Sequence, residues 1–274
     1  MHPPRLVVSN PPHEEVDVDA AAGLIGLDVY QARLKFIFPA PEVLAASDGQ
    51  YATGVAESFE RAGVNVAVID GQELAAIPWP DPVSSFGFTG SGMTARSHRR
   101  EVELPYDTDV VGVYCRPPAD FRMKPPETRV GPLSDGFEIV EAIEWMPSLD
   151  LYFVRDGALQ RISIVGGLTD FSGLGASQQR SVAEDMAATV AGCSRRFTRM
   201  HLDTRLENVR PRRRFKGGDS AFNPDMRKRY SFGTLLLRHI LSSISPELGE
   251  LTQYELGSRL GYLTSRGHAP PGAR

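Results

Sequence analysis

The sequence predicts an α+β protein: a small N-terminal α/β module, a central antiparallel β-rich module capped by a helix, and a C-terminal helical hairpin. Residues 149–154 and 159–165 carry apolar side chains in the pattern of strands, and Asp156-Gly157 between them suits a tight hairpin turn. Apolar residues spaced three and four apart follow, as on one face of a helix. Shorter stretches of both kinds precede them in residues 1–78.

A hairpin with one apolar face does not stay folded alone in water, so we expect other strands to complete its sheet and the following helix to cover it. This requirement divides the chain into five expected segments. They are a small α/β module (1–78), a β-rich module with its capping helix (79–193), a basic loop (194–230), a helical hairpin (231–266) and a disordered tail (267–274).

The N-terminal module is expected to alternate strands and helices. Asp28 suits the cap of a second helix, which Pro39 and Pro41 stop, and Gly63 suits the end of a third. The expected strands are 5–9, 41–46 and 64–70, and the expected helices run through 20–22, 29–38 and 49–63, with a helical turn at 74–77.

This order, together with Gly26-Leu27-x-Val29-x-x-Ala32-Arg33-x-x-Phe36 and Ala62-Gly63-Val64-x-Val66, resembles the C-terminal domain of the ribosomal stalk protein, a fold shared with the Clp protease adaptor. The resemblance covers about residues 5–70 and implies a small α/β protein-interaction fold. In the stalk family the second helix carries lysines that meet translation factors. Here Tyr30 replaces one of them and Arg33 keeps another position basic.

The central module is expected to consist mainly of strands. The predicted strands are 84–89, 93–97, 109–115 and 137–145, with a polar insertion at 98–103 and a proline-rich loop at 116–132. After the hairpin, Ser177 is expected to cap the covering helix and Gly192 to end it. Over residues 84–191 this layout is similar to pleckstrin-homology-like domains, which are half-open barrels capped by a helix.

Two leucine-rich helices are predicted near the C-terminus. Ser231 suits the cap of a helix over 232–244, and Ser245-Pro246-Glu247 opens a last helix whose leucines extend to Leu263. We expect an antiparallel helical hairpin that packs on the body or on a partner protein.

Composition predicts an ordinary water-soluble globular protein, with 41% hydrophobic and 23% charged residues. No apolar run is long enough for a membrane span or a signal-peptide core, so we expect a cytoplasmic protein. Cys115 and Cys193 lie far apart and outside any CxxC pair, which favours buried free thiols over a disulfide or zinc site. We expect no cofactor.

Charge is distributed unevenly along the chain. Residues 195–229 hold twelve basic and four acidic residues, a net charge of +8, which leaves −12 elsewhere because the total is −4. Such a segment indicates either an anionic partner or a basic strap on the protein's own acidic surface. The candidates for binding a polyanion are Arg195, Arg196, Arg210, Arg212, Arg213, Arg214, Lys216, Arg227, Lys228 and Arg229.

Catalytic motifs are absent from the sequence: it contains no HExxH, GxSxG or P-loop. His201-x-Asp203 lacks a third metal ligand nearby, which favours a structural role. The glycines at 166–167 and 173–175 precede a helix, as in phosphate-binding loops, but their spacing favours simple loop flexibility.

Three hypotheses of function remain. The first is a non-enzymatic intracellular protein that binds or regulates a protein partner. The second is binding of nucleic acid or another polyanion through residues 195–229. The third is an unrecognised enzyme that uses acidic groups, for which the candidates are Asp150, Asp156, Asp170 and Asp203.

Overall fold

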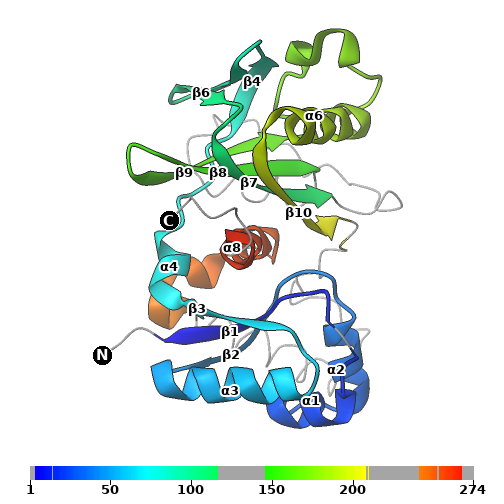
Figure 1. Cartoon of the computed structure of the whole chain (residues 1–274), viewed down its shortest axis with the longest axis vertical. Coiled ribbons are helices and arrows are strands. Elements are labelled where there is room, and N and C mark those ends of the chain that lie inside the picture. Colours follow the sequence, from blue (N-terminus) through cyan, green and yellow to red (C-terminus); the bar gives the residue numbers. More distant parts are fainter. Residues whose placement is uncertain are drawn as a thin grey trace, which may run out of the picture. The chain divides into compact units, whose positions relative to one another are not determined.

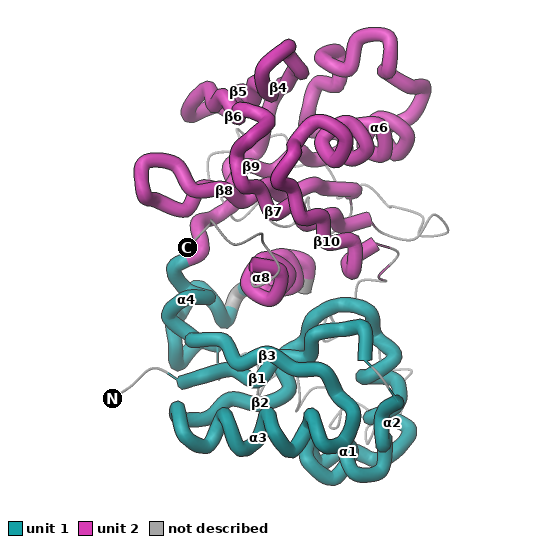
Figure 2. Tube along the Cα trace, in the orientation of Figure 1, with its two compact units in different colours: residues 1–76, 211–253 teal, residues 77–210, 254–274 magenta. Residues whose placement is uncertain are grey.

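The structure of the chain, a computed structural model, describes residues 4–13, 15–116, 146–207, 209, 241–251 and 253–266. Its fold is mixed α+β, as predicted, with sheets that are antiparallel except for one strand pair and with no closed barrel among the described residues (Figure 1). Two compact units share the chain (Figure 2). Residues 1–76 and 211–253 form unit 1, and residues 77–210 and 254–274 form unit 2.

Unit 1 starts with the elements that the sequence predicts, in the predicted order. Its strands form an antiparallel three-stranded sheet with the order β2-β1-β3. The elements are β1 (Arg5–Ser9), α1 (Val18–Ile25), α2 (Val29–Phe36), β2 (Val43–Ser47), α3 (Gly49–Arg61), β3 (Val66–Asp70) and α4 (Gly71–Ala76).

Short polar side chains and a glycine set the ends of the first two helices. The side chains of Asp17 and Asp28 accept hydrogen bonds from the backbone N–H groups of Ala20 (3.0 Å) and Gln31 (2.9 Å). Gly26, with φ of 63°, ends α1 in the left-handed region. Helices α1, α2 and α3 lie on one side of the sheet (Figure 1), and together they bury Val7, Ala21, Ala22, Ala32, Phe36, Ala52, Ala56, Phe59, Ala62 and Val64.

Unit 2 is built around the predicted hairpin. β8 (Ser148–Arg155) and β9 (Ala158–Val165) pair antiparallel, and both turn residues, Asp156 (φ 53°) and Gly157 (φ 75°), have the positive φ of a tight hairpin turn. The hairpin prediction is confirmed. One sheet has the order β10-β7-β8-β9 and the other the order β4-β5-β6; their further strands are β4 (Val83–Phe88), β5 (Gly92–Ser97), β6 (Glu101–Pro105), β7 (Asp109–Arg116) and β10 (Arg199–Glu207).

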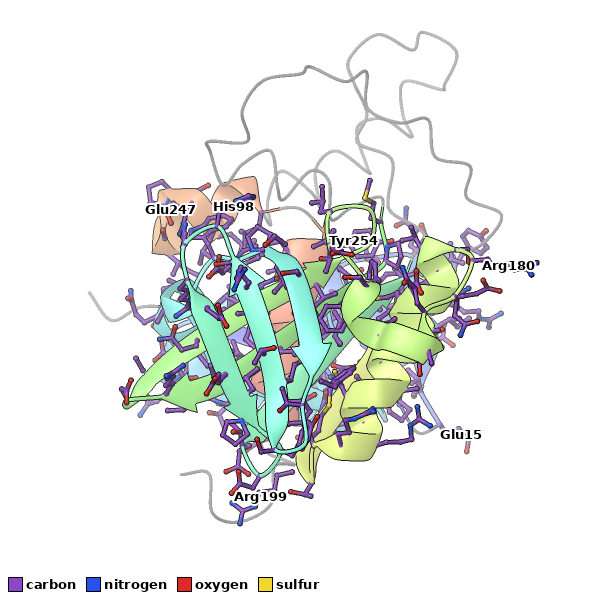
Figure 3. The ribbon with its side chains drawn as sticks, turned by 90° about the horizontal axis from the view of Figure 1, so that it is seen from above. Glu15, His98, Arg180, Arg199, Glu247 and Tyr254 are labelled. Carbon is purple, nitrogen blue, oxygen red and sulfur yellow. The ribbon has the colours of Figure 1, made fainter. Side chains whose placement is uncertain are left out.

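β6 corrects the prediction of a polar insertion at 98–103. Only the turn that carries His98, at one end of the β4–β6 sheet, is an insertion (Figure 3). Val102 and Leu104 point into the core while Glu101 and Glu103 are exposed, so the segment is a strand with one polar face.

α6 (Val182–Arg196) covers the core that the two sheets share (Figure 1), but both of its ends differ from the prediction. Ser181 caps it by accepting a hydrogen bond from the Glu184 N–H (3.3 Å), whereas Ser177 ends the short 3-10 helix η1 (Ser172–Ser177). Gly192 lies inside the helix and does not end it. It faces the Phe88 ring, and a Cβ on Gly192 would lie only 3.0 Å from a carbon of that ring.

β10 corrects the prediction that residues 194–230 form a loop. Residues 195 and 196 belong to α6, and Arg199–Glu207 form a strand that pairs in parallel with β7. Met200 and Leu202 pack against the core of unit 2, and polar or charged residues alternate with them along the chain. This is the alternation of a strand, which the many charged residues of the segment make hard to recognise in the sequence.

In the C-terminal part, the last α-helix begins later than the sequence predicts. Residues 246–250 form a 3-10 helix, η2 (Pro246–Glu250), and the α-helix α8 (Gln253–Ser265) starts only afterwards. Ile244 packs in unit 1 beside Gly71. A Cβ on Gly71 would lie 2.9 Å from the Cδ1 of Ile244. The predicted strand 137–145, all of the loop 116–132 except Arg116, the helical residues 232–240 and the tail 267–274 lie outside the described residues.

Candidate functional site

The four-stranded sheet of unit 2 has one apolar face and one face that mixes polar side chains with apolar ones such as Val113 and Leu206. Leu149, Leu151 and Phe153 of β8 point into the core below α6, whereas Asp150 and Tyr152 point to the other side. That other side is covered by α8, which lies across the sheet from α6 (Figure 1). This mixed face is therefore buried instead of facing water.

Three ion pairs link four charged side chains between the sheet and α8. Arg161 of β9 donates to Asp150 Oδ2 (2.8 Å) and makes two hydrogen bonds to the Glu255 carboxylate of α8 (2.6 and 2.7 Å). Arg259, one helical turn after Glu255, donates from Nε to Glu255 Oε1 (2.7 Å). All four side chains are buried, and their charges sum to zero. We call them, with Ser163 and Ser258, the buried charge cluster.

Hydroxyl groups complete this cluster. Ser163 donates to Asp150 Oδ1, and Ser258 donates to Asp150 Oδ2 (2.5 Å). The Tyr152 hydroxyl lies 2.8 Å from the Ser258 Oγ, and its ring stacks on Tyr262 with centroids 4.5 Å apart. Both oxygens of Asp150 therefore have donors, which stabilises a carboxylate away from water.

Two glycines let α8 approach the sheet closely. A Cβ on Gly257 would lie 2.9 Å from Leu206 Cδ2, and a Cβ on Gly261 would lie 2.8 Å from Asp203 Oδ2. Near the end of α8, Arg205 donates to Asp203 (2.7 Å) and to the Thr264 hydroxyl (2.8 Å). A second polar contact thus holds the far end of the helix.

Burial and neighbouring charges act in opposite directions on Glu255. Burial alone would raise its pKa, but the Arg161 and Arg259 guanidinium groups outweigh this effect and hold the pKa below its ordinary value of 4.5. Asp203 behaves in the same way, since Arg205 lowers its pKa against the effect of burial. Burial raises the pKa of the Cys115 thiol well above its ordinary value, so Cys115 is an inert, buried thiol.

The acidic residues that the sequence offered as catalytic candidates lie in different surroundings. Asp150 and Asp203 both face α8 and both pair with Val113 of β7, one from each side. Each is covered by α8 and holds an arginine. Asp156 lies in the exposed hairpin turn, and Asp170 accepts hydrogen bonds from Ser172. Within the described ranges, no three His, Cys, Asp or Glu side chains are grouped to hold a metal ion.

Only two of the ten candidates for polyanion binding are described. Arg195 and Arg196 are exposed in the last turn of α6, and the Arg196 guanidinium lies over the Phe88 ring, 4.5 Å from its centroid. Arg210, Arg212, Arg213, Arg214, Lys216, Arg227, Lys228 and Arg229 lie outside the described residues. Arg199, at the end of unit 2 opposite to His98 (Figure 3), pairs with Asp109 (3.7 Å).

Unit 1 exposes apolar side chains on and beside α2. Tyr30, Leu34 and Ile37 are 70%, 49% and 71% exposed, and their spacing of four and three residues places them on one helical face. Leu24, Leu27 and Val29, which are close to them in sequence, are also exposed; we call these six residues the α1–α2 strip. Large apolar side chains that are gathered on a surface, rather than scattered, mark interaction sites.

One cation accompanies this strip. Arg33 is exposed on α2 between Tyr30 and Leu34, and it forms no ion pair with any residue that the structure describes. Lys35, in contrast, pairs with Glu42 at 2.8 Å.

Sequence reasoning missed most of the buried charge cluster, because it singled out only Asp150. A signal was present: polar residues recur at every second position of β8 and β9, and three polar residues follow the i, i+3, i+4 spacing on α8. These residues are Ser148, Asp150 and Tyr152; Arg161 and Ser163; and Glu255, Ser258 and Arg259.

Comparison with protein-family models, with curated proteins and with solved structures finds no match for this chain. Among the described residues, no helix combines the length and the apolar character that a membrane span needs.

Glu255→Gln is expected to destabilise the protein strongly. It removes one charge from a buried set and breaks the ion pairs of Glu255 with Arg161 and Arg259, and breaking a buried pair costs about 3–5 kcal/mol. The matched control is Glu101→Gln, since Glu101 pairs with Arg96 at 2.8 Å on the surface, where loss of a pair costs less than about 1 kcal/mol. Urea denaturation measures both; equal losses would contradict a cluster shielded from water.

The stability of the protein is expected to fall as the pH falls below about 4.5, the ordinary pKa of Glu255. Because the pKa of Glu255 is lower in the folded than in the unfolded chain, its contribution is present above that pH and is lost as the pH falls through the folded pKa. Urea denaturation between pH 6 and pH 3, values chosen to bracket roughly this range, should show a shallower dependence for Glu255→Gln. If the free energy of unfolding falls equally with pH in the wild type and in Glu255→Gln, the Glu255 carboxylate does not contribute to this pH dependence.

Proposed function

We propose that this chain is a non-enzymatic binding protein that docks a protein partner on the α1–α2 strip of unit 1. The observation that carries the proposal is the exposure of six large apolar side chains within fourteen residues, from Leu24 to Ile37, three of them on one face of α2. An α-helix that leaves such a face in water gains free energy when a partner covers it.

The partner that fits best is an amphipathic helix with an acidic residue beside its apolar face. The spacing of Tyr30, Leu34 and Ile37 suits packing of a second helix along α2. Arg33 lies within this face and offers a cation for a carboxylate of the partner.

Two fold-level comparisons support a binding role. The order β-α-α-β-α-β and the sheet order β2-β1-β3 of unit 1 support its resemblance to the stalk-protein C-terminal domain and the Clp adaptor. For unit 2, strands followed by the covering helix α6 support a pleckstrin-homology-like layout, from which the parallel strand β10 departs. Folds of this kind host many functions, so the surface itself carries the proposal.

A photo-crosslinker placed at Tyr30 is expected to capture the partner. Tyr30 is 70% exposed, so p-benzoylphenylalanine fits there without repacking. The same group at Val154, which is 60% exposed on the hairpin of unit 2, serves as the control. Binding of the captured protein is then measured by calorimetry. Tyr30→Glu with Leu34→Glu should weaken it at least about 30-fold, since buried aromatic anchors contribute about 2 kcal/mol or more, and Arg33→Glu should weaken it less.

Two results would contradict this proposal. One is capture of the same protein from positions 30 and 154 alike, which would indicate unspecific contact. The other is unchanged affinity of the doubly substituted chain, provided that its unfolding curve matches the wild type.

We also propose, as a second candidate, that the basic segment binds nucleic acid. The net charge of +8 over residues 195–229 and the exposure of Arg195 and Arg196 support it.

Replacing Arg212, Arg213 and Arg214 by Ala is expected to weaken binding of a labelled single-stranded RNA. Each lost phosphate contact removes about 0.7 from the slope of log affinity against log salt, so the three together remove about 2. Fluorescence anisotropy at several salt concentrations measures the slope, with Arg99→Ala, at an exposed arginine of the β5–β6 turn, as the control. An unchanged slope would eliminate this candidate.

A further inference from the structure

The segment that follows β1 in unit 1 is fastened to the start of β3 through a histidine side chain. His13 Nδ1 accepts a hydrogen bond from the backbone N–H of Asn65 (3.2 Å). The Asn65 carbonyl oxygen accepts the N–H of Asn10 (2.8 Å), and its side-chain amide donates to the carbonyl oxygen of Pro12 (3.5 Å). We call residues 10–13 the His13 clasp.

The His13 ring also packs on the helices of unit 1. It lies edge-to-face with the ring of Phe36, the last residue of α2, and the ring centroids are 6.0 Å apart. Phe36 in turn lies beside Phe59 of α3, with centroids 6.5 Å apart, in the core of the unit. His13 thus joins the start of a strand to the helical layer that covers the sheet.

The hydrogen bonding of His13 requires the neutral form of its ring. A backbone N–H can only donate, so Nδ1 carries a lone pair and the single ring proton lies on Nε2. Nε2 is buried and has no hydrogen-bond partner among the described residues. In the charged form the Nδ1–H would point at the Asn65 N–H, and both ring N–H groups would lack an acceptor. Buried donors without acceptors are costly, so the closed clasp disfavours protonation.

No charge in the part of the chain that the structure describes offsets this cost. Burial is the one cause that shifts the pKa of His13, and it lowers the pKa below the ordinary value of 6.5. The charged residues on the elements around the ring do not contribute to this shift. They are Glu15 and Asp17 on the same segment, Arg33 and Lys35 on α2, Glu57, Glu60 and Arg61 on α3, and Asp70 on β3.

We propose that the His13 clasp is operated by a proton: the neutral ring closes the clasp on Asn65 and Phe36, and protonation of the ring in mild acid opens it. Histidine is the side chain whose charge ordinarily changes in this range. Opening removes a packing contact from Phe36 and so loosens the end of α2, the helix that carries part of the α1–α2 strip. The inference uses the contacts of His13 alone and stands whether or not the strip binds a partner.

The clasp is expected to be closed above pH 6.5 and to open as the pH falls. Because the pKa of His13 is lower in the closed than in the open clasp, the open state takes up the proton first. Between about pH 7.5 and about pH 5, the open state should gain at least about threefold and at most about 30-fold, the limit that an open-state pKa of 6.5 sets. Protection of the Asn65 amide against hydrogen exchange, corrected for the intrinsic effect of pH, should fall by this factor; unchanged protection would contradict the proposal.

Nuclear magnetic resonance on the full wild-type chain tests the mechanism directly. The His13 Cε1–H signal should titrate with a midpoint below 6.5, and the Asn65 amide proton should shift upfield with the same midpoint as its hydrogen bond is lost. Nuclear Overhauser effects between the His13 and Phe36 rings should disappear in acid. The Val64 amide, which donates to the Phe59 carbonyl oxygen (3.0 Å), is the internal control and should shift far less. A midpoint at or above 6.5, or ring contacts that persist once His13 is charged, would overturn the proposal.

His13→Gln separates protonation of this ring from other effects of acid. The glutamine amide oxygen can accept from the Asn65 N–H but does not ionise, so the Asn65 amide should no longer titrate. His98→Gln is the matched control, because His98 is exposed in a turn of unit 2, and the Asn65 titration should persist there. If Asn65 titrates as before in His13→Gln, another group opens the segment and the proposal is wrong. If His13→Gln does not fold, the wild-type titration decides by itself.

Discussion

The pairing of Arg161 with Glu255 is the interaction on which the architecture of unit 2 depends. Arg161 is a buried guanidinium on β9, the last strand in the order of its sheet, and Asp150 beside it accepts only part of the hydrogen bonds that it can donate. Glu255 arrives from 94 residues further along the chain and accepts two of its hydrogen bonds. Without that carboxylate the Arg161 guanidinium would lose a buried counter-charge, which is costly in the absence of water.

The two units thus show opposite departures from the usual distribution of side chains. Unit 2 buries a charged set under α8, and unit 1 exposes apolar side chains on α2. An exposed Leu or a surface ion pair on its own would carry little information, whereas a buried charge or a gathered apolar surface requires a physical explanation.

The sequence predicts well those elements whose turn, cap and strand residues are neighbours in the chain. The β8–β9 hairpin, the cap at Asp28 and the three strands of unit 1 depend on neighbouring residues, and they were found. β6 and β10 were missed because their solvent-facing positions carry Glu and Arg, which hide the buried alternation of Val102 with Leu104 and of Met200 with Leu202. The end of α6 was misplaced because Gly192 serves a contact with Phe88, a residue far away in the chain.

The sequence by itself determined the local elements: where turns accept positive φ, where helices begin, and which strand residues alternate. Those preferences act between residues a few positions apart, so they can be derived from the order of side chains alone. Only the tertiary structure decided which polar residues are removed from water. Asp150 and Tyr152 look like the solvated face of a strand until a helix from the end of the chain covers them, and burial of that kind depends on contacts between distant segments.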